Sequence, residues 1–414
     1  MGFGVTGVYL ALDTVIVPVL VLTVASEELK NTFLGVLGFS GLLVTVLVQL
    51  VIGRLSDRTR SRLGRRIPYL LWGGVFTCIG ITGFGFTAQY LGSDDIAFAA
   101  KSVALFGVWV FIQININVAY GPFQALIRDL VPMVRIGIAS SLKVLMESIG
   151  AVAMIAIGGA LIGHYTGPEA IEWLWLTLGV LGVTVLVSTS ITSLTVHSME
   201  SRVAHAGDSS EAAPPVISGL HPHLIWFLLS RFSMIAGIVI FQTYGLFFLR
   251  DVVGLENPAQ AMGSIILAVG GALALSVYPA GWLSDRVGRK PVVLAGAAGA
   301  AIGAIAMLYA GGIFGVVIIA SLIGASVGVV LSASWALAND LGTEGREAQH
   351  MSMVTIATVG GAAVAKVIGP LVDLPGYGYS GLLISCAVLF LFGALLLMPL
   401  KADLRRSISA EPFA

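Results

Sequence analysis

The chain has 414 residues, of which 57% are hydrophobic and 11% are charged, and its formal net charge is zero. A soluble domain carries about 25% charged residues, so this chain has too little polar surface to coat a water-soluble globule. The composition excludes an ordinary soluble enzyme or binding domain and predicts a protein embedded in lipid. The charge balance gives no indication of a nucleic-acid partner.

Twelve apolar segments are long enough to cross a bilayer, which takes about 20 helical residues. The first has no charged leader or small-residue cleavage site, so we expect it to be a retained helix. The expected spans lie at residues 3–25, 32–53, 67–88, 102–126, 138–162, 171–195, 223–249, 260–282, 291–311, 313–338, 351–372 and 380–400. This pattern predicts an all-α membrane protein with twelve transmembrane helices in two pseudo-symmetric six-helix bundles, at 1–196 and 222–414, joined by a polar linker at 197–221.

Basic residues are distributed unevenly between the two sides of the predicted membrane. If the N-terminus is cytoplasmic, sixteen Lys and Arg lie on the cytoplasmic side, and only Lys30, Lys101 and Arg250 lie on the outer side. Loops that face the cytoplasm are enriched in Lys and Arg. We therefore expect a multi-pass protein of the cell (cytoplasmic or inner) membrane, with both termini and the linker in the cytoplasm.

The two halves repeat a short pattern. Gly-x-Leu-Ser-Asp-Arg follows the second expected helix from residue 53 and the eighth from residue 281, and an acid-leucine pair ends the fourth and tenth helices. The residues that recur at these ends, with their neighbours, are Gly53, Asp57, Arg58, Arg128, Asp129, Gly281, Asp285, Arg286 and Asp340. Two copies of a six-helix unit are the plan of many secondary transporters, with the solute site between the halves.

At both copies the chain resembles the major facilitator superfamily, whose signature is Gly-x-x-x-Asp-Arg followed by basic residues. The resemblance implies a cytoplasmic latch for the outward-open state, with Asp57 as its acid and Arg128 or one of the loop arginines as the partner. A glycine lets helix ends pack closely, and an aspartate can sit at a helix N-terminus or pair with arginine. The alternative is that these arginines only fix the topology.

Three stretches also resemble the sucrose/proton symporter family of plants and its animal and bacterial relatives. They are the loop at 56–68, the fourth helix from Asn117 through Gly-Pro to Asp-Leu, and an acid before a proline in the first helix. Plant members have a carboxylate where this chain has Gln113 and an arginine where it has Gln124. The related melibiose permeases hold sodium with acids in the second helix, which has none here, although Lys366 resembles their lysine in helix 11. The resemblance implies a sugar and a coupling proton.

Five ionisable residues fall at bilayer depth, namely Asp13, Lys143, Glu147, Arg231 and Lys366. Each costs at least roughly 2.5–3.5 kcal/mol on insertion scales and is therefore a functional hypothesis. Lys143 and Glu147 lie four residues apart on one helix face and can pair, so a structural ion pair is the alternative for them. Arg231 could instead extend to the cytoplasmic edge.

A carboxyl group that alternates between a buried setting and one beside a cation binds and releases a proton, which is what proton coupling requires. Asp13 and Glu147 could both meet this requirement. Glu147 has Lys143 one turn away, which would hold it ionised, whereas Asp13 has no cation on its own helix. We therefore predict Asp13 as the proton site, with Glu147 as the second candidate.

Polar residues along the fourth helix predict a solute path. They recur at i, i+4, i+7 and i+11 and share one face. Amide and phenol groups can bind hydroxyls, while hydrogen bonds between helices are the alternative role. The predicted solute-binding residues are Gln113, Asn117, Tyr120, Gln124, Lys143, Arg231, Gln242, Trp335 and Lys366.

These observations favour a secondary active transporter that moves a small polar solute, a sugar or glycoside, by proton-coupled symport with alternating access. An exporter of amphipathic compounds and a non-transporting sensor or assembly factor remain alternatives. The sequence contains no recognisable nucleophile–base pair, metal cluster or phosphate-binding loop, so we expect no enzyme activity, cofactor or metal. We expect a monomer whose partners are the solute, protons and the lipid bilayer.

Overall fold

The computed structural model describes residues 1–59, 61, 63–91, 97–131, 136–165, 170–203, 222–341 and 347–400, and these contain helices and no strands. Twelve helical segments of the described chain are long and apolar enough to cross a membrane, which confirms the predicted count. Most of the predicted linker, from residue 204 to 221, lies outside the described residues.

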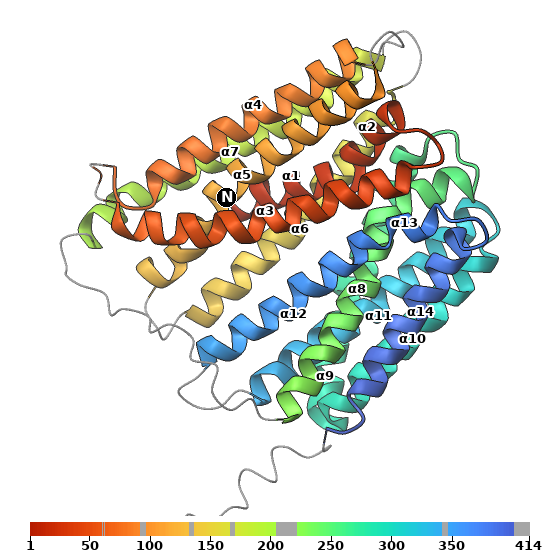
Figure 1. Cartoon of the computed structure of the whole chain (residues 1–414). Helices are drawn as coiled ribbons and strands as arrows, with labels where there is room; N and C mark the ends of the chain where they lie inside the picture. The colour runs from red at the N-terminus through yellow and green to blue at the C-terminus, as the bar shows by residue number, and fades with distance from the viewer. Residues whose placement is uncertain are drawn as a thin grey trace, which may run out of the picture. The chain divides into compact units, whose positions relative to one another are not determined.

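The chain forms two compact units, one of residues 1–211 with 256–264 and one of residues 212–255 with 265–414. The first unit is drawn from red to yellow-green in Figure 1. Its helices are α1 (Gly2–Ala11), α2 (Val17–Val24), α3 (Lys30–Arg58), α4 (Ile67–Leu91), α5 (Phe98–Leu130), α6 (Ile136–Ile162) and α7 (Ala170–Val203).

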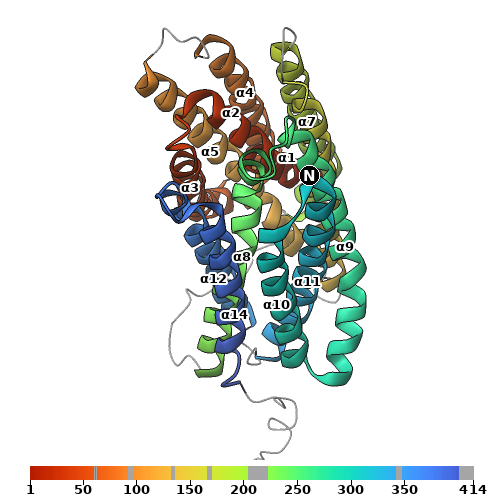
Figure 2. The ribbon, with the colours of Figure 1, turned by 90° about the vertical axis from the view of Figure 1, so that its right-hand side faces the viewer.

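The second unit is drawn from green to blue, and most of its helices are labelled in Figure 2. Its helices are α8 (Pro222–Asp251), α9 (Pro258–Val287), α10 (Arg289–Ala306), α11 (Gly312–Asp340), α12 (Glu347–Val367), α13 (Gly369–Val372) and α14 (Gly378–Leu396). The first residues of α9 are grouped with the first unit, so α9 contributes to both.

Equivalent helices pair in the same way within each unit. In the first unit α1 packs on α6 and α7, and α4 packs on α5 and α7. In the second unit α8 packs on α12 and α14, and α10 packs on α11 and α14. Each pair of the second unit corresponds to a pair six spans earlier, so the internal repeat of the sequence is a repeat of three-dimensional packing.

One of these equivalent helix pairs, α1 with α6 and α8 with α12, packs closely in both units because a glycine lies at the contact. A Cβ added to Gly150 of α6 would overlap the backbone of Phe3 on α1, and one added to Gly361 of α12 would overlap the backbone of Phe232 on α8. Lipid provides little hydrophobic drive for helices to associate, so close backbone packing contributes much of the stability. The high glycine content thus has a direct structural use at this contact.

Two details differ from the sequence-based expectation. The repeated motif was expected after the second and eighth helices, but residues 53–58 form the end of α3 and residues 281–286 lie inside α9. Neither motif contains a proline, the strongest helix breaker, and a helix that leaves the bilayer can continue into water.

The first span is also interrupted, because residues Leu12–Ile16 form a π-helical turn between α1 and α2. In this turn the Val17 N–H bonds to the Leu12 carbonyl. Pro18 follows directly and has no N–H to donate.

Candidate functional site

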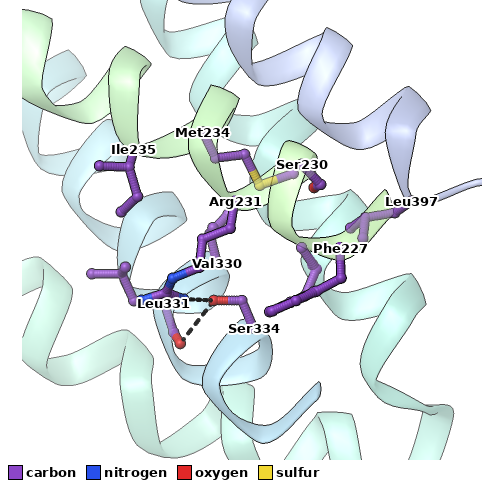
Figure 3. A pocket seen from close by; sticks show the side chains of 10 residues that line it. Phe227, Ser230, Arg231, Met234, Ile235, Val330, Leu331, Ser334 and Leu397 are labelled. Carbon is purple, nitrogen blue, oxygen red and sulfur yellow. Dashed lines mark hydrogen bonds between the residues drawn. The ribbon is translucent and has the colours of Figure 1, made fainter. Parts of the chain in front are cut away.

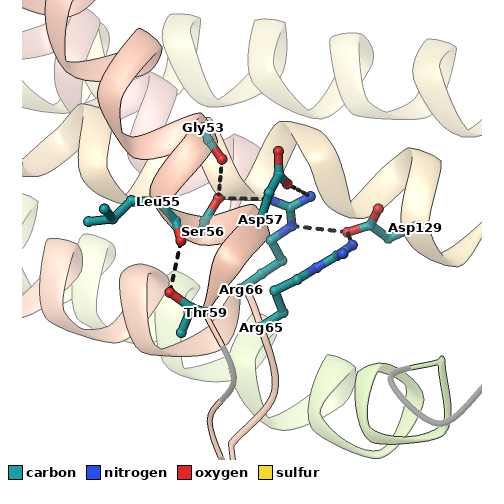
Figure 4. A network of polar contacts seen from close by, with 8 residues as sticks. All are labelled: Gly53, Leu55, Ser56, Asp57, Thr59, Arg65, Arg66 and Asp129. Carbon is teal, nitrogen blue, oxygen red and sulfur yellow. Dashed lines mark hydrogen bonds and ion pairs between the residues drawn. The ribbon is translucent and has the colours of Figure 1, made fainter. Parts of the chain in front are cut away.

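The end of α3 and the start of α4 carry a network of charges centred on Arg66 (Figure 4). The Arg66 side chain is buried, and its Nη2 lies 2.7 Å from Oδ1 of Asp57. Its Nη1 donates to the Ser56 hydroxyl at 2.6 Å, and its Nε donates to Asp129 of α5 at 3.0 Å. Arg65 donates to the same oxygen of Asp129 at 2.9 Å. One arginine thus ties the ends of α3 and α5 to the start of α4.

The second copy of the motif keeps the local geometry and lacks this network among the described residues. The Ser284 hydroxyl donates to the Gly281 carbonyl, as Ser56 donates to Gly53. The guanidinium of Arg286 stacks on the Trp282 ring at 3.9 Å, and the exposed Asp285 makes no ion pair with a described residue. Among the described residues, the network of ion pairs is therefore found at the first copy of the motif and not at the second.

Other residues of the predicted latch are placed as follows. Arg58 is exposed and makes no ion pair with a described residue. The side chains of Arg128 and Asp340 lie outside what the structure describes. Gly53 has no described atom within 4 Å of an added Cβ, and for Gly281 the nearest is at 3.6 Å. Close packing is therefore not the reason for glycine at either position.

A second polar cluster lies within the membrane-spanning part of the first unit. The Lys143 Nζ is 3.0 Å from Oε1 of Glu147 and 3.2 Å from Oε2. The Tyr120 hydroxyl of α5 donates to Oε1 of Glu147 at 2.9 Å, and Lys143 donates to that hydroxyl at 3.3 Å. Both charged side chains are largely buried. The predicted Lys143–Glu147 pair is present, and Tyr120 joins it from the neighbouring helix.

The polar residues of the α5 stripe differ in their surroundings and contacts. Asn117 donates to Thr45 of α3 at 2.9 Å and accepts from Gln49 of α3 at 3.0 Å. It therefore makes the hydrogen bonds between helices that were left open as its alternative role. Gln113 is fully buried, and neither of its amide atoms has a hydrogen-bond partner among the described residues, while Gln124 is exposed.

Asp13 lies in the π-helical turn and is half-buried. Such turns are rare, and they occur often at functional sites. The predicted proton site thus coincides with the one irregular turn in the first span.

In the second unit, Arg231 reaches across from α8 to two other helices. Its Nε donates to the Thr358 hydroxyl of α12 at 3.0 Å, and its Nη1 donates to the Ser334 hydroxyl of α11 at 2.9 Å. Its guanidinium carbon lies 4.5 Å from the centre of the Trp335 ring. Two predicted solute-binding residues, Arg231 and Trp335, are therefore in direct contact.

The two remaining predicted residues of this unit lie apart from that contact in sequence. Lys366 is buried near the end of α12, where its carbonyl accepts from the Tyr244 hydroxyl at 2.9 Å. Gln242 of α8 is exposed and has no hydrogen-bond partner among the described residues.

The sequence did not single out Arg66 as the centre of the charge network, nor Ser334 and Thr358 as partners of Arg231. Arg66 directly precedes α4 and lies two residues before Pro68. Arg289, in the second half, also lies two residues before a proline, Pro291. Arg289 donates to the Ala336 carbonyl of α11. This shared position before the proline is the signal that could have identified Arg66.

Comparison with known proteins agrees with this architecture. Residues 1–345 match the model of the family described as MFS/sugar transport protein. The chain belongs to this family. Its fold is the twelve-helix major facilitator fold, and the family is one of transport proteins and not of enzymes.

Two curated relatives match shorter parts of the chain. The inner membrane transport protein YajR of Escherichia coli strain K12 is 29% identical over 147 residues, which are 35% of this chain and 30% of YajR. The sucrose transport protein SUT4 of Oryza sativa subsp. indica is 34% identical over 94 residues, which are 20% of this chain and 16% of SUT4. The chain therefore spans less than a third of the length of either relative.

Solved structures match over almost the whole chain. A D-xylose-proton symporter has a TM-score of 0.73 and 15% identity, covering 98% of this chain and 97% of its own. A bacterial homologue of the iron transporter ferroportin, in an inward-facing state, has a TM-score of 0.72 and 16% identity, covering 96% and 95%. At this level of identity the likeness shows the fold alone.

Proposed function

We propose that this protein carries a small polar solute, a sugar or glycoside, across the membrane by proton-coupled symport with alternating access. The observation that carries the proposal is the cluster of Tyr120, Lys143 and Glu147 inside the first unit. A phenol, an ammonium and a carboxylate offer hydrogen-bond donors and acceptors to the hydroxyl groups of a solute. Those hydroxyls can replace the bonds that the three side chains make with one another. The description of the family and the name of the sucrose transport relative also support a sugar.

Asp13 is the site that takes up the proton, and Glu147 is the second candidate. Glu147 accepts hydrogen bonds from two donors, Lys143 and Tyr120. Asp13 lies in a π-helical turn, where a local rearrangement of the helix can change the surroundings of its carboxyl group. A carrier needs such a change in order to load a proton on one side and release it on the other.

The network around Arg66 acts as the cytoplasmic latch. This assignment requires that the ends of α3 and α5 face the cytoplasm, and with them both termini and the linker, in a cell membrane. The basic residues support this orientation, because sixteen Lys and Arg lie on the side of these ends, counting all its loops, the linker and the tail, and three lie on the other side. The protein works as a monomer.

Uptake by purified protein in proteoliposomes tests this function. With an imposed pH gradient, acid outside, we expect labelled sugar or glycoside to accumulate and a protonophore to abolish the accumulation. Asp13→Asn should lose gradient-driven accumulation and keep the exchange of labelled for unlabelled solute, because exchange needs no net proton movement. Glu256→Gln, which changes an exposed acid between α8 and α9, is the matched control and should behave like the parent.

Accumulation by Asp13→Asn at the level of the parent would exclude Asp13 as the proton site. Accumulation that ignores the protonophore and follows a sodium gradient would exclude proton coupling. Uptake of amphipathic compounds in place of every sugar tested would favour the exporter.

A further inference from the structure

One face of α9 ends in an aromatic ring and a cation that touch each other. The guanidinium carbon of Arg286 lies 3.9 Å from the centre of the Trp282 ring, a cation–π contact. Both side chains are exposed, and neither makes a hydrogen bond or an ion pair with a described residue. Asp285 is the neighbour of Arg286 in sequence, but consecutive residues of a helix do not face each other. The ring thus holds the guanidinium, whose five N–H groups have no acceptor among the described residues.

Other cations of the second unit have acceptors within the protein. Arg289 donates to a main-chain carbonyl of α11, and Lys290 donates to two main-chain carbonyls just after α14, at 2.7 and 2.6 Å. Arg231 is buried and donates to the Ser334 hydroxyl (Figure 3). The first two stabilise helix ends and the third joins helices, whereas Arg286 presents its donors at the surface.

The face that carries Trp282 continues along α9 as an exposed apolar and aromatic stripe. Tyr278 lies one turn before the ring and is 82% exposed, and Leu275 lies two turns before it and is 79% exposed. The opposite face packs on α11, where a Cβ added to Gly328 would lie 2.7 Å from the carbonyl oxygen of Leu273. Because α9 is long and apolar enough to cross a membrane, its exposed stripe is a surface for lipid chains. The cation lies one turn, about 6 Å, beyond the ring, in the direction of the headgroups.

We propose that Trp282 and Arg286 bind one anionic phospholipid of the bilayer, with its phosphate at the guanidinium and an acyl chain along Tyr278 and Leu275. The planar fork of arginine matches two phosphate oxygens, and the indole N–H can donate to an ester carbonyl of the lipid. A headgroup with a net negative charge supplies the counter-charge that the described residues do not. Topology alone would require the cation and not the ring that holds it. Binding at this site needs neither solute nor proton, so it is independent of the carrier function proposed above.

Quenching of tryptophan fluorescence in nanodiscs tests the site. The full-length protein is reconstituted in phosphatidylcholine with a small fraction of brominated lipid, either phosphatidylglycerol or phosphatidylcholine with the same chains. Bromine quenches a nearby indole, and the difference between the parent and Trp282→Phe isolates Trp282 from the other tryptophans of the chain. We expect phosphatidylglycerol to be enriched at Trp282 about fivefold over phosphatidylcholine, the order expected for one arginine at a membrane surface.

Arg286→Gln should remove this enrichment, and Arg286→Lys should keep part of it, because lysine retains the charge and loses the fork. Arg58→Gln is the matched control. Arg58 holds the equivalent place in the first copy of the motif and is exposed, but Arg54 stands there in place of the ring. This variant should leave the enrichment at Trp282 unchanged. Inorganic phosphate should release no more lipid than chloride at equal ionic strength, since the free anion cannot use the apolar stripe.

Equal quenching by the two brominated lipids in the parent would overturn the proposal, as would an enrichment that survives in Arg286→Gln. Loss of the enrichment in Arg58→Gln to the same extent would show a response to surface charge in general, without a site at Trp282. Specific release by inorganic phosphate would show a site for a free anion in place of a lipid. Either of these results would also overturn it.

Discussion

Arg66 and Asp57 form an ion pair of 2.7 Å in which the two partners have unlike surroundings. The arginine side chain is 6% exposed, whereas the carboxylate is 59% exposed. Arg66 also holds Ser56 and Asp129, so it stays in place when Asp57 leaves. Asp57 is therefore the partner that can release during a conformational change, and Arg66 is the fixed one.

Asp57→Asn should slow transport and leave solute binding unchanged. The residue lies beyond the apolar part of α3, at a helix end, so it cannot contact a solute near the bilayer midplane. Because the carboxylate is mostly exposed, we expect a reduction in rate of about two- to fivefold. Initial uptake rates and equilibrium binding, measured on the same preparations, give the two quantities.

Asp285→Asn, at the equivalent place in the second half, has no ion pair to lose among the described residues and should match the parent in both measurements. A variant of Asp57 that binds solute far more weakly but turns over normally would contradict the assignment.

Arg66→Gln should reduce the rate more strongly than Asp57→Asn. It removes the partner of Asp57, the donor to the buried Ser56 hydroxyl and one of the two arginine donors of Asp129, and an unsatisfied buried partner costs more than a lost exposed contact. We expect about a tenfold loss of rate. Arg58→Gln removes an equal charge from the same helix end, at an exposed side chain, and should change the rate little. Equal losses of rate in Arg66→Gln and Arg58→Gln would show that only the positive charge matters at this position. That result would support the alternative in which the arginines only fix the topology.

A variant series at Lys143 and Glu147 separates a structural from a functional ion pair. Glu147→Gln should destabilise the protein by about 3 kcal/mol, since it leaves the largely buried ammonium of Lys143 without its counter-charge. The double variant Lys143→Met with Glu147→Leu should regain the melting temperature of the parent, because it removes both charges, and yet transport no solute. Melting curves in detergent and proteoliposome uptake measure the two effects. Parental uptake by the double variant would reduce the pair to a structural role.

Hydropathy predicted all twelve spans, because each must satisfy its own backbone in lipid and is therefore a long apolar helix. It could not predict the π-helical turn at Leu12–Ile16. Pro18 indicates an irregularity in the first span, but whether the chain bends, breaks or adds a residue to one turn depends on the packing of neighbouring helices.

The sequence could indicate single residues of the candidate site, but it could not indicate most of their contacts. Charged side chains are costly at bilayer depth, which singles out Lys143, Glu147 and Arg231. The i, i+4 spacing then predicts the pairing of Lys143 with Glu147, which is local in sequence. The partners of Arg231 lie 103 and 127 residues away on other helices, and no local pattern encodes them. The stripe on α5 likewise gives no sign of its partners, since Asn117 bonds to α3 while Tyr120 bonds to α6.

The predicted topology can be tested with single cysteines at Ser209 and Ser93, which both lie outside the described residues. The background must lack Cys78 and Cys386, the two free cysteines of the chain. An impermeant thiol reagent applied to intact cells should label Ser93→Cys, and should label Ser209→Cys only after the cells are opened. Labelling of Ser209→Cys from outside would invert the orientation and remove the cytoplasmic assignment of the Arg66 network.

Gly150→Ala should destabilise the first unit, because the added methyl group would overlap the backbone of Phe3 where α1 and α6 cross. Backbone cannot move aside as a flexible side chain can, so we expect a loss of about 1–3 kcal/mol, the usual cost of overpacking. Gly107→Ala is the matched control: this glycine of α5 is exposed and has no described atom within 4 Å of an added Cβ. Its melting temperature in detergent should equal or slightly exceed that of the parent, since alanine favours the helix. Equal melting temperatures for both variants would show that the α1–α6 contact tolerates a Cβ and is looser than the structure describes.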